Sequence, residues 1–268
     1  MIAYNALAMF QLTREIRFAV NRTAPTQVKV TNGHGGYPSL VGLGHYFALQ
    51  ITLAGELEPA SQYLLNIKRI DDVVRERAIA RVIEAVQLQT PGAELLTTLF
   101  TQLRDGWSGP RLVSLTLLLS PFLRVSAYES ELPMVRLSQK FEFSAAHRLH
   151  NPALSDAENR EVFGKCNNPH GHGHNYELQV TVRGQSDANG QLIDVPTLER
   201  IVAMTVINRF DHKHLNIEVP EFRELIPSVE NIAGVIYKLL KPELQTDRTS
   251  LASVTVWETP KTWCEYSE

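Results

Sequence analysis

The sequence predicts an α+β protein built from two similar units, each running strand, strand, helix, helix, strand, strand. Two observations carry this prediction. Residues 42–55 and 171–184 match at their opening glycines, at one histidine, at Leu-Gln, at a threonine and at the closing glycine. In the later segment, Glu177, Gln179 and Thr181 alternate with apolar residues, which is typical of an antiparallel strand with one buried face.

The remaining elements follow in the same order in both halves of the chain. Residues 65–67 resemble residues 193–195, and each tripeptide precedes a helical pattern. A second helix and two further strands then follow in each half. The expected helices are residues 68–86 and 93–103 in the first half and 197–210 and 230–240 in the second, and the expected third strands contain residues 114–117 and 253–256.

A turn-rich segment separates the two copies. Polar and turn-forming residues fill positions 126–133, so we place the boundary near Val135 and expect domains at residues 1–130 and 135–268. A four-stranded sheet exposes two edges, which an oligomer can remove by closing several sheets into a barrel. We therefore expect a homo-oligomer, and a trimer would supply six domains for two barrels.

The composition indicates a folded protein of the cytoplasm. Hydrophobic residues make up 44% of the chain and charged residues 21%, which is ordinary globular usage. The formal charge of -3 gives no electrostatic reason to expect a nucleic-acid or membrane partner, so an anionic substrate must be held by local groups. The apolar run 112–123 is too short to span a bilayer. Two cysteines and the absence of a recognisable signal peptide favour a reducing compartment.

A histidine cluster carries the clearest chemical signal. Alternate residues of a strand point to the same side, so His172 and His174 can offer two imidazoles to one metal ion. His147, at the end of an alternating segment, can supply a third from a neighbouring strand. Three imidazoles leave one tetrahedral position open, as in catalytic zinc sites, although other transition metals also accept imidazoles. We do not expect His150, His170 or His214 to be ligands.

Cysteine and acid–base side chains accompany the histidines. Cys166 stands six residues before His172 and could be a fourth ligand, a nucleophile or base, or a small loop residue; we favour a thiolate base. Asp211 and His212 form a pair typical of a histidine whose tautomer is set for proton transfer. Glu258 lies in an otherwise apolar strand, where a carboxylate needs a partner such as the paired N–H donors of a pterin or guanine ring.

These residues together resemble a known family. Residues 137–268 are similar to the 6-pyruvoyltetrahydropterin synthases, most specifically along Phe163-Gly164-Lys165-Cys166-Asn167-Asn168-Pro169 and Gly171-His172-Gly173-His174-Asn175-Tyr176. The resemblance also covers residues 143–149, 154–159, 211–213, 230–231 and 258–259, so it extends across one whole domain.

The resemblance implies the T-fold, in which domains of four strands and two helices assemble as trimers into barrels. It implies a carbon–oxygen lyase of tetrahydrobiopterin biosynthesis that uses zinc to convert 7,8-dihydroneopterin triphosphate to 6-pyruvoyltetrahydropterin with elimination of triphosphate. By position, Cys166 would take protons from the substrate and Asp211 with His212 would relay them. Glu258 would anchor the pterin, and Glu230 is a further candidate for contact with it.

Two departures from the family pattern leave alternatives open. Val229 stands where a hydroxyl residue is common, and Trp257 replaces a tyrosine. A related enzyme, 6-carboxytetrahydropterin synthase of deazaguanine (queuosine) biosynthesis, shares the ligands, but its cysteine typically stands nearer the paired histidines. A protein that binds a pterin or purine without turnover is the third alternative.

The first half of the chain resembles a degenerate copy of the same domain. Leu43 stands at the position of His172, and Leu119 at that of Glu258. His45 is retained alone, and no cysteine is present in this half. We expect a non-catalytic domain that is structural or forms an interface.

Overall fold

The computed structural model describes residues 9–22 and 33–268, and it divides into two compact units. The first comprises residues 1–137 with 184–192, and the second residues 138–183 with 193–268. Residues 1–8 and 23–32 of the expected first domain lie outside the described part of the chain. No helix in the described residues is long and apolar enough to cross a membrane.

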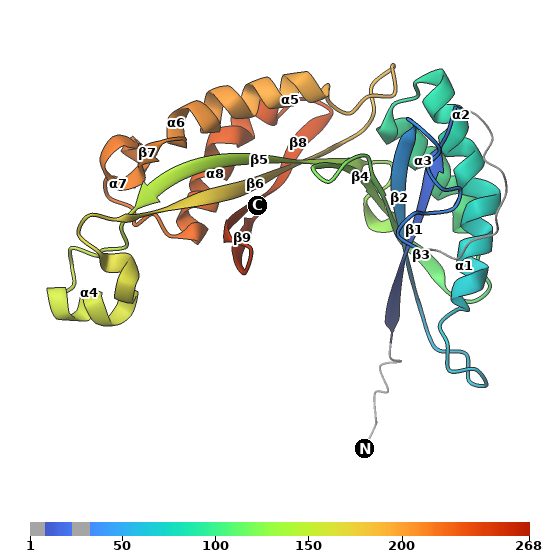
Figure 1. Cartoon of the computed structure of the whole chain (residues 1–268), viewed down its shortest axis with the longest axis horizontal. Coiled ribbons are helices and arrows are strands. Elements are labelled where there is room, and N and C mark those ends of the chain that lie inside the picture. Colours follow the sequence, from blue (N-terminus) through green and yellow to red (C-terminus); the bar gives the residue numbers. More distant parts are fainter. Residues whose placement is uncertain (1–8, 23–32) are drawn as a thin grey trace. The chain divides into compact units, whose positions relative to one another are not determined.

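The first unit combines an antiparallel sheet of order β1-β2-β3-β4 with a set of helices that follow β2 (Figure 1). Its core forms because apolar residues recur at helical spacing, as at Leu96, Leu99, Phe100 and Leu103, all fully buried. The elements are β1 (Phe10–Val20), β2 (His45–Gly55), α1 (Ile67–Val74), the π-helical segment η1 (Arg75–Ile79), α2 (Ala80–Leu88), α3 (Gly92–Arg104), β3 (Arg111–Leu118) and β4 (Leu123–Tyr128).

The second unit has the strand order β5-β6-β8-β9, with the short β7 paired to β5 (Figure 1). Helix α8 packs on β8 and β9 and also contacts α5. The main elements are β5 (Val135–His147), β6 (His172–Gly184), α5 (Val195–Val202), η4 (Ala203–Ile207), α6 (Asn208–Phe210), α8 (Val229–Leu244), β8 (Thr249–Thr259) and β9 (Thr262–Tyr266). The shorter ones are α4 (Asp156–Phe163), η3 (Gly164–Asn167), β7 (Lys213–His214), α7 (Leu215–Glu218) and η5 (Pro220–Phe222), and η2 (Glu129–Glu131) lies in the first unit.

The first helical run has the same local structure in both units. Its N-cap is Asn66 in the first unit and Asp194 in the second, and each side chain accepts a hydrogen bond from the backbone of the first turn. In both runs an α-helical segment of 8 residues passes into a π-helical segment of 5, which begins at Arg75 and at Ala203. Because π-helical turns are rare, two unrelated helical runs would seldom share one at the same position.

The structure also departs from the sequence-based expectations. The segment 126–133 is not all turn, because β4 extends to Tyr128 and the Ser126 hydroxyl lies 2.9 Å from that of Thr116 on β3. The polar face of β6 is buried at two of its three residues, because Gln179 and Thr181 are as buried as their apolar neighbours while Glu177 is partly exposed. Thr181 fits there because its hydroxyl lies 3.0 Å from that of Ser138, which satisfies both buried groups.

Candidate metal centre

Three imidazoles meet where β5 ends and β6 begins. His147 is the last residue of β5, and His172 and His174 open β6 on the same face of the strand. One nitrogen of each ring can be chosen so that all three lie within 4.8 Å of one another, and these three form the one such cluster in the described chain. The structure thus brings together the three predicted ligands.

The protonation of His147 leaves a lone pair directed at its neighbours. Its Nδ1 lies 2.7 Å from the carbonyl oxygen of Pro227 and donates its proton there, because a carbonyl can only accept. Burial lowers the pKa of His147 to about 4, so the ring is neutral near pH 7 and Nε2 carries no proton. That bare nitrogen lies 3.1 Å from Nε2 of His172.

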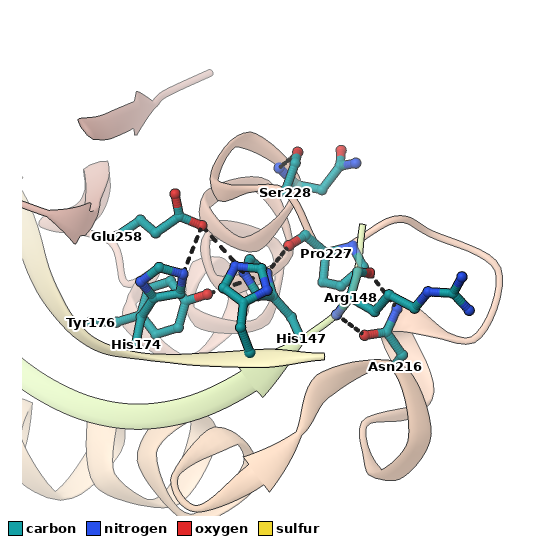
Figure 2. Close-up of polar contacts among 10 residues, drawn as sticks. His147, Arg148, His174, Tyr176, Asn216, Pro227, Ser228 and Glu258 are labelled. Atoms are coloured by element: carbon teal, nitrogen blue, oxygen red, sulfur yellow. Dashed lines mark hydrogen bonds and ion pairs between the residues drawn. The ribbon is translucent and has the colours of Figure 1, made fainter. Parts of the chain in front are cut away.

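A carboxylate faces the same point. The Oε1 atom of Glu258, on β8, lies 3.4 Å from Nε2 of His147 and 3.7 Å from Nε2 of His174 (Figure 2). The buried Nε2 of His174 has no hydrogen-bond partner in the described chain. Imidazole nitrogens and a carboxylate oxygen that converge on one point suit a cation, so these residues fit a metal ion. Imidazole ligands are those that zinc and its neighbours in the first transition series accept.

A second layer of contacts holds His147 in this orientation. Besides the Pro227 carbonyl, the hydroxyl of Tyr176 lies 3.3 Å from Nδ1 (Figure 2). Tyr176 is fully buried on β6, and burial raises its pKa, so it stays a neutral phenol. Such outer contacts set the tautomer of a metal-binding histidine. Tyr176 lies two residues after His174, a spacing that could have marked it, but Pro227 carried no sequence signal.

Cys166 lies near the centre but outside the cluster of ligands. It is half-buried in η3, the turn that follows α4. Its carbonyl oxygen accepts the N–H of Leu149 at 2.9 Å, and the side chain of Asn167 donates to the Leu149 carbonyl at 2.8 Å. The cysteine segment is therefore fastened to the chain two residues beyond His147. Of the alternatives for Cys166, the fourth-ligand role has no support, because the ligand cluster contains histidines only.

Asp211 and His212 form the expected pair, and His212 lines a cavity together with His174 of the histidine cluster. Nδ1 of His212 lies 2.7 Å from Asp211, whose other oxygen accepts the Ser144 N–H at 2.7 Å. The Ser144 N–H and His212 hold the pKa of Asp211 below its usual range. The His212 side chain is 82% exposed. Within residues 9–22 and 33–268, no hydrogen bond or ion pair links this pair to Cys166 or to the three histidines.

Glu230 occupies the first turn of α8, beside the segment that holds His147. The N-cap of α8 is Ser228, which follows Pro227 directly, and a hydrogen bond with Ser228 lowers the pKa of Glu230. Cys264, on β9, pairs with Val256 of β8, and burial raises the pKa of its thiol. Glu230 therefore borders the centre, whereas Cys264 occupies a pairing position in the sheet.

The first unit lacks this centre in its described residues. Leu43, at the position of His172, is 94% exposed, and His45 stacks on Phe47. A cavity of about 490 Å³ borders both residues together with Arg22 and Gln87, and no cluster of three metal-binding side chains lies there.

Comparison with known proteins places the second unit in a family. A family model described as 6-pyruvoyl tetrahydropterin synthase matches residues 136–268. A 6-pyruvoyl tetrahydrobiopterin synthase of Drosophila melanogaster is 43% identical over 143 residues, which are 51% of this chain and 82% of that protein. The chain belongs to the 6-pyruvoyl tetrahydropterin synthase family.

Two further proteins extend the family comparison. A solved 6-pyruvoyl tetrahydropterin synthase of Caenorhabditis elegans is 38% identical, with a TM-score of 0.48, and the match covers 52% of this chain and 98% of that chain. A 6-carboxy-5,6,7,8-tetrahydropterin synthase of Haemophilus influenzae is 30% identical over 156 residues, which are 50% of this chain and all of that protein. All three histidines and Glu258 lie within the part that the family model matches.

Proposed function

We propose that this chain is a zinc-dependent lyase that converts 7,8-dihydroneopterin triphosphate to 6-pyruvoyltetrahydropterin with elimination of triphosphate. The observation that carries the proposal is the convergence of three histidine nitrogens and one carboxylate oxygen in the part that matches the family. The relatives named for 6-pyruvoyl tetrahydrobiopterin synthesis support this choice of product.

The histidines and the glutamate divide the binding of metal and substrate. His147, His172 and His174 would hold zinc. When bound, zinc would lower the pKa of substrate hydroxyls and stabilise the negative charge that develops in the rearrangement. Glu258 would accept hydrogen bonds from the adjacent N–H groups of the pterin. Because Glu258 lies beside the histidines, a pterin bound to it would lie next to the metal ligands. Glu230, on the bordering turn of α8, would be a further contact.

Cys166 is the proposed base that removes protons from the substrate side chain. A thiol serves as a base in its thiolate form, and positive charge near it favours that form. The backbone hydrogen bond from the Leu149 N–H to the Cys166 carbonyl holds the cysteine segment beside the end of β5, where His147 lies. A binding protein without turnover would need neither this thiol nor the Asp211–His212 pair.

Asp211 and His212 are proposed to relay protons, and their exposure suggests how. Within one chain they do not contact Cys166, and His212 presents its ring to solvent. We therefore propose a homo-oligomer, with three chains as the expected number, in which the exposed pair meets the cysteine of a neighbouring chain. Closed cyclic assemblies place the same two surfaces of each chain in contact.

A tandem duplication best explains the first unit. We propose that residues 1–130 are a degenerate, non-catalytic T-fold domain and residues 135–268 the catalytic one. The matching element order and the matching π-helical segments support a common origin. Both domain types would contribute their sheets to oligomeric barrels, in which edge strands find partners.

Two other functions are testable alternatives. The Haemophilus influenzae relative favours 6-carboxytetrahydropterin as the product, and a non-catalytic pterin- or purine-binding protein remains the other class. For the setting we propose the cytoplasm, which the two unpaired cysteines support.

A direct assay separates these functions. Zinc-loaded, full-length protein is incubated with 7,8-dihydroneopterin triphosphate, and both triphosphate release and product mass are measured. The proposal expects triphosphate and a product with the mass of 6-pyruvoyltetrahydropterin. A product with the mass of 6-carboxytetrahydropterin would identify the chain as a 6-carboxytetrahydropterin synthase instead. Pterin binding without release of triphosphate would indicate a non-catalytic binding protein.

A further inference from the structure

A second cavity lies beside the metal centre and has a different chemical character. It encloses about 350 Å³ in the second unit and borders the end of β5, the turn before β6, α7 and the segment that leads into α8. The charged and polar residues of its lining are Arg148, His150, His214, Asn216, Arg223 and Glu224. The proposed catalytic roles use none of these side chains.

Arg148 is held in place so that part of its guanidinium group stays free. The side chain of Asn216 accepts the Arg148 N–H at 2.8 Å and donates to the Arg148 carbonyl at 3.0 Å (Figure 2). Nε of Arg148 donates to the Asn167 carbonyl at 3.1 Å. The two terminal nitrogens make no ion pair in the described chain, and Figure 2 shows them directed away from His147. Arg223, also without an ion pair there, adds a second positive charge.

Two imidazoles face the same space. Nδ1 of His150 lies 3.1 Å from the side-chain nitrogen of Asn167 and accepts its proton, so the His150 proton resides on Nε2 and can be donated. His214 approaches the backbone of Gly171 so closely that a Cβ there would lie 2.8 Å from its Nε2. The buried Nδ1 of His214 has no partner among the described residues. Against these groups, Glu224 is the one carboxylate among the described lining residues.

This combination suits phosphate oxygens. Guanidinium groups bind phosphate through paired N–H donors, and imidazole N–H groups add single donors. The chain carries a formal charge of -3, so an anion would be attracted by local groups rather than by the molecule as a whole. We propose that this cavity binds a polyphosphate chain, namely the triphosphate tail of the pterin substrate. The assignment of the bound polyphosphate to the pterin substrate rests on the proposed function. The ability of the cavity to bind phosphate groups rests on its own side chains.

The cavity shares its wall with the metal centre. Arg148 follows the ligand His147 directly, and Ile226 precedes Pro227, whose carbonyl holds the His147 ring. A substrate whose hydroxyls are held by the histidines would therefore have its phosphates beside the arginines. This arrangement separates the leaving triphosphate from the pterin ring, which Glu258 would hold on the other side of the ligands.

The test measures inorganic triphosphate binding to zinc-loaded, full-length protein by calorimetry, with metal content checked after each titration. We expect Arg148→Gln and Arg223→Gln each to weaken binding by about tenfold or more, the range for a lost hydrogen bond between charged groups. Glu224→Gln should tighten binding severalfold because it removes the opposing charge. Arg200→Gln, an exposed residue of α5, is the matched control and should leave binding unchanged.

The outcomes of this test are independent of turnover. Equal binding by the wild type and both arginine variants, or no binding by the wild type at millimolar triphosphate, would overturn the cavity proposal even if the enzyme is active. Arginine-dependent binding in a protein that releases no triphosphate would support the cavity and reject the proposed function. Circular dichroism and zinc content identify any variant that has lost its fold. Arg148→Lys, which retains the positive charge, should bind triphosphate more tightly than Arg148→Gln does.

Discussion

The Nε2 atoms of His147 and His172 lie 3.1 Å apart, and the hydrogen bond from His147 Nδ1 to the Pro227 carbonyl leaves the lone pair of His147 Nε2 facing His172. Glu258 directs a carboxylate oxygen to the same point. Two imidazole nitrogens and a carboxylate oxygen therefore converge on one point, where a single cation could contact all of them. This geometry is the physical reason for treating the cluster as a metal centre.

Removing a histidine of the cluster should remove the metal. We expect His172→Ala and His174→Ala each to weaken zinc binding by more than about 100-fold, beyond the usual cost of losing an outer contact. Zinc content after dialysis against a chelator measures this. His170→Ala is the control, since His170 is exposed in the turn that precedes β6 and should keep full occupancy. Full occupancy in both cluster variants would contradict the assignment.

Acid should destabilise the metal-free protein through His147. Its folded pKa of about 4 lies below the ordinary histidine value of 6.5, so the unfolded chain binds the proton more readily between these values. The stability contributed by the neutral ring is present above pH 6.5 and is lost as the pH falls to 4, about 3 kcal/mol in total. Urea unfolding across that range measures it. His147→Gln should show a flatter pH profile; an identical profile would exclude His147 as the cause.

The two cysteines should differ sharply when each is replaced by alanine. Cys166→Ala should lower kcat by about 10²- to 10⁴-fold, the usual contribution of a general base, and leave zinc content intact. Cys264→Ala should retain activity, because Cys264, on β9, occupies a strand-pairing position opposite Val256 of β8. The measurement is steady-state triphosphate release. Unchanged turnover in Cys166→Ala would remove the thiol from the mechanism.

Mixing two inactive variants should restore activity if sites form between chains. Cys166→Ala and Asp211→Asn are each expected to be inactive. After unfolding and refolding together at equal amounts, roughly one quarter of the sites should combine an intact cysteine with an intact aspartate from a neighbouring chain. Recovery of activity in the mixture, compared with each variant refolded alone, checks this. A mixture as inactive as its components would place both residues in one chain's site.

Two neighbouring glycines should tolerate alanine differently. Gly171 has a φ of +72°, and a Cβ there would lie 2.9 Å from the His147 carbonyl oxygen, so Gly171→Ala should cost about 2 kcal/mol or more. A Cβ at Gly173 would meet nothing nearer than the Ala145 oxygen at 3.5 Å, so Gly173→Ala should cost less than about 1 kcal/mol. Urea midpoints of both variants test the difference. Equal midpoints would show that the Gly171 backbone can relax.

Much of the fold could be predicted because its signals are local. The alternation along β6 and the caps at Asn66 and Asp194 can be recognised without tertiary information, since each depends on residues only a few positions apart. Helix α4 was not predicted as an element, although its capping box of Ser155 and Glu158 is local too. The burial of Thr181 could not be predicted, because it depends on Ser138, which lies 43 positions away.

The sequence by itself determined that His172 and His174 share a face, because the period of a strand is two residues. It also contained the motif on which the family resemblance rests. Only the tertiary structure brought Glu258 to the histidines, fixed the His147 proton through Pro227 and joined Asp211 to the Ser144 N–H. The cavity that joins Arg148 with Arg223 also depends on the fold alone. Distances between residues far apart in the chain follow from how strands and loops pack, and no local pattern encodes them.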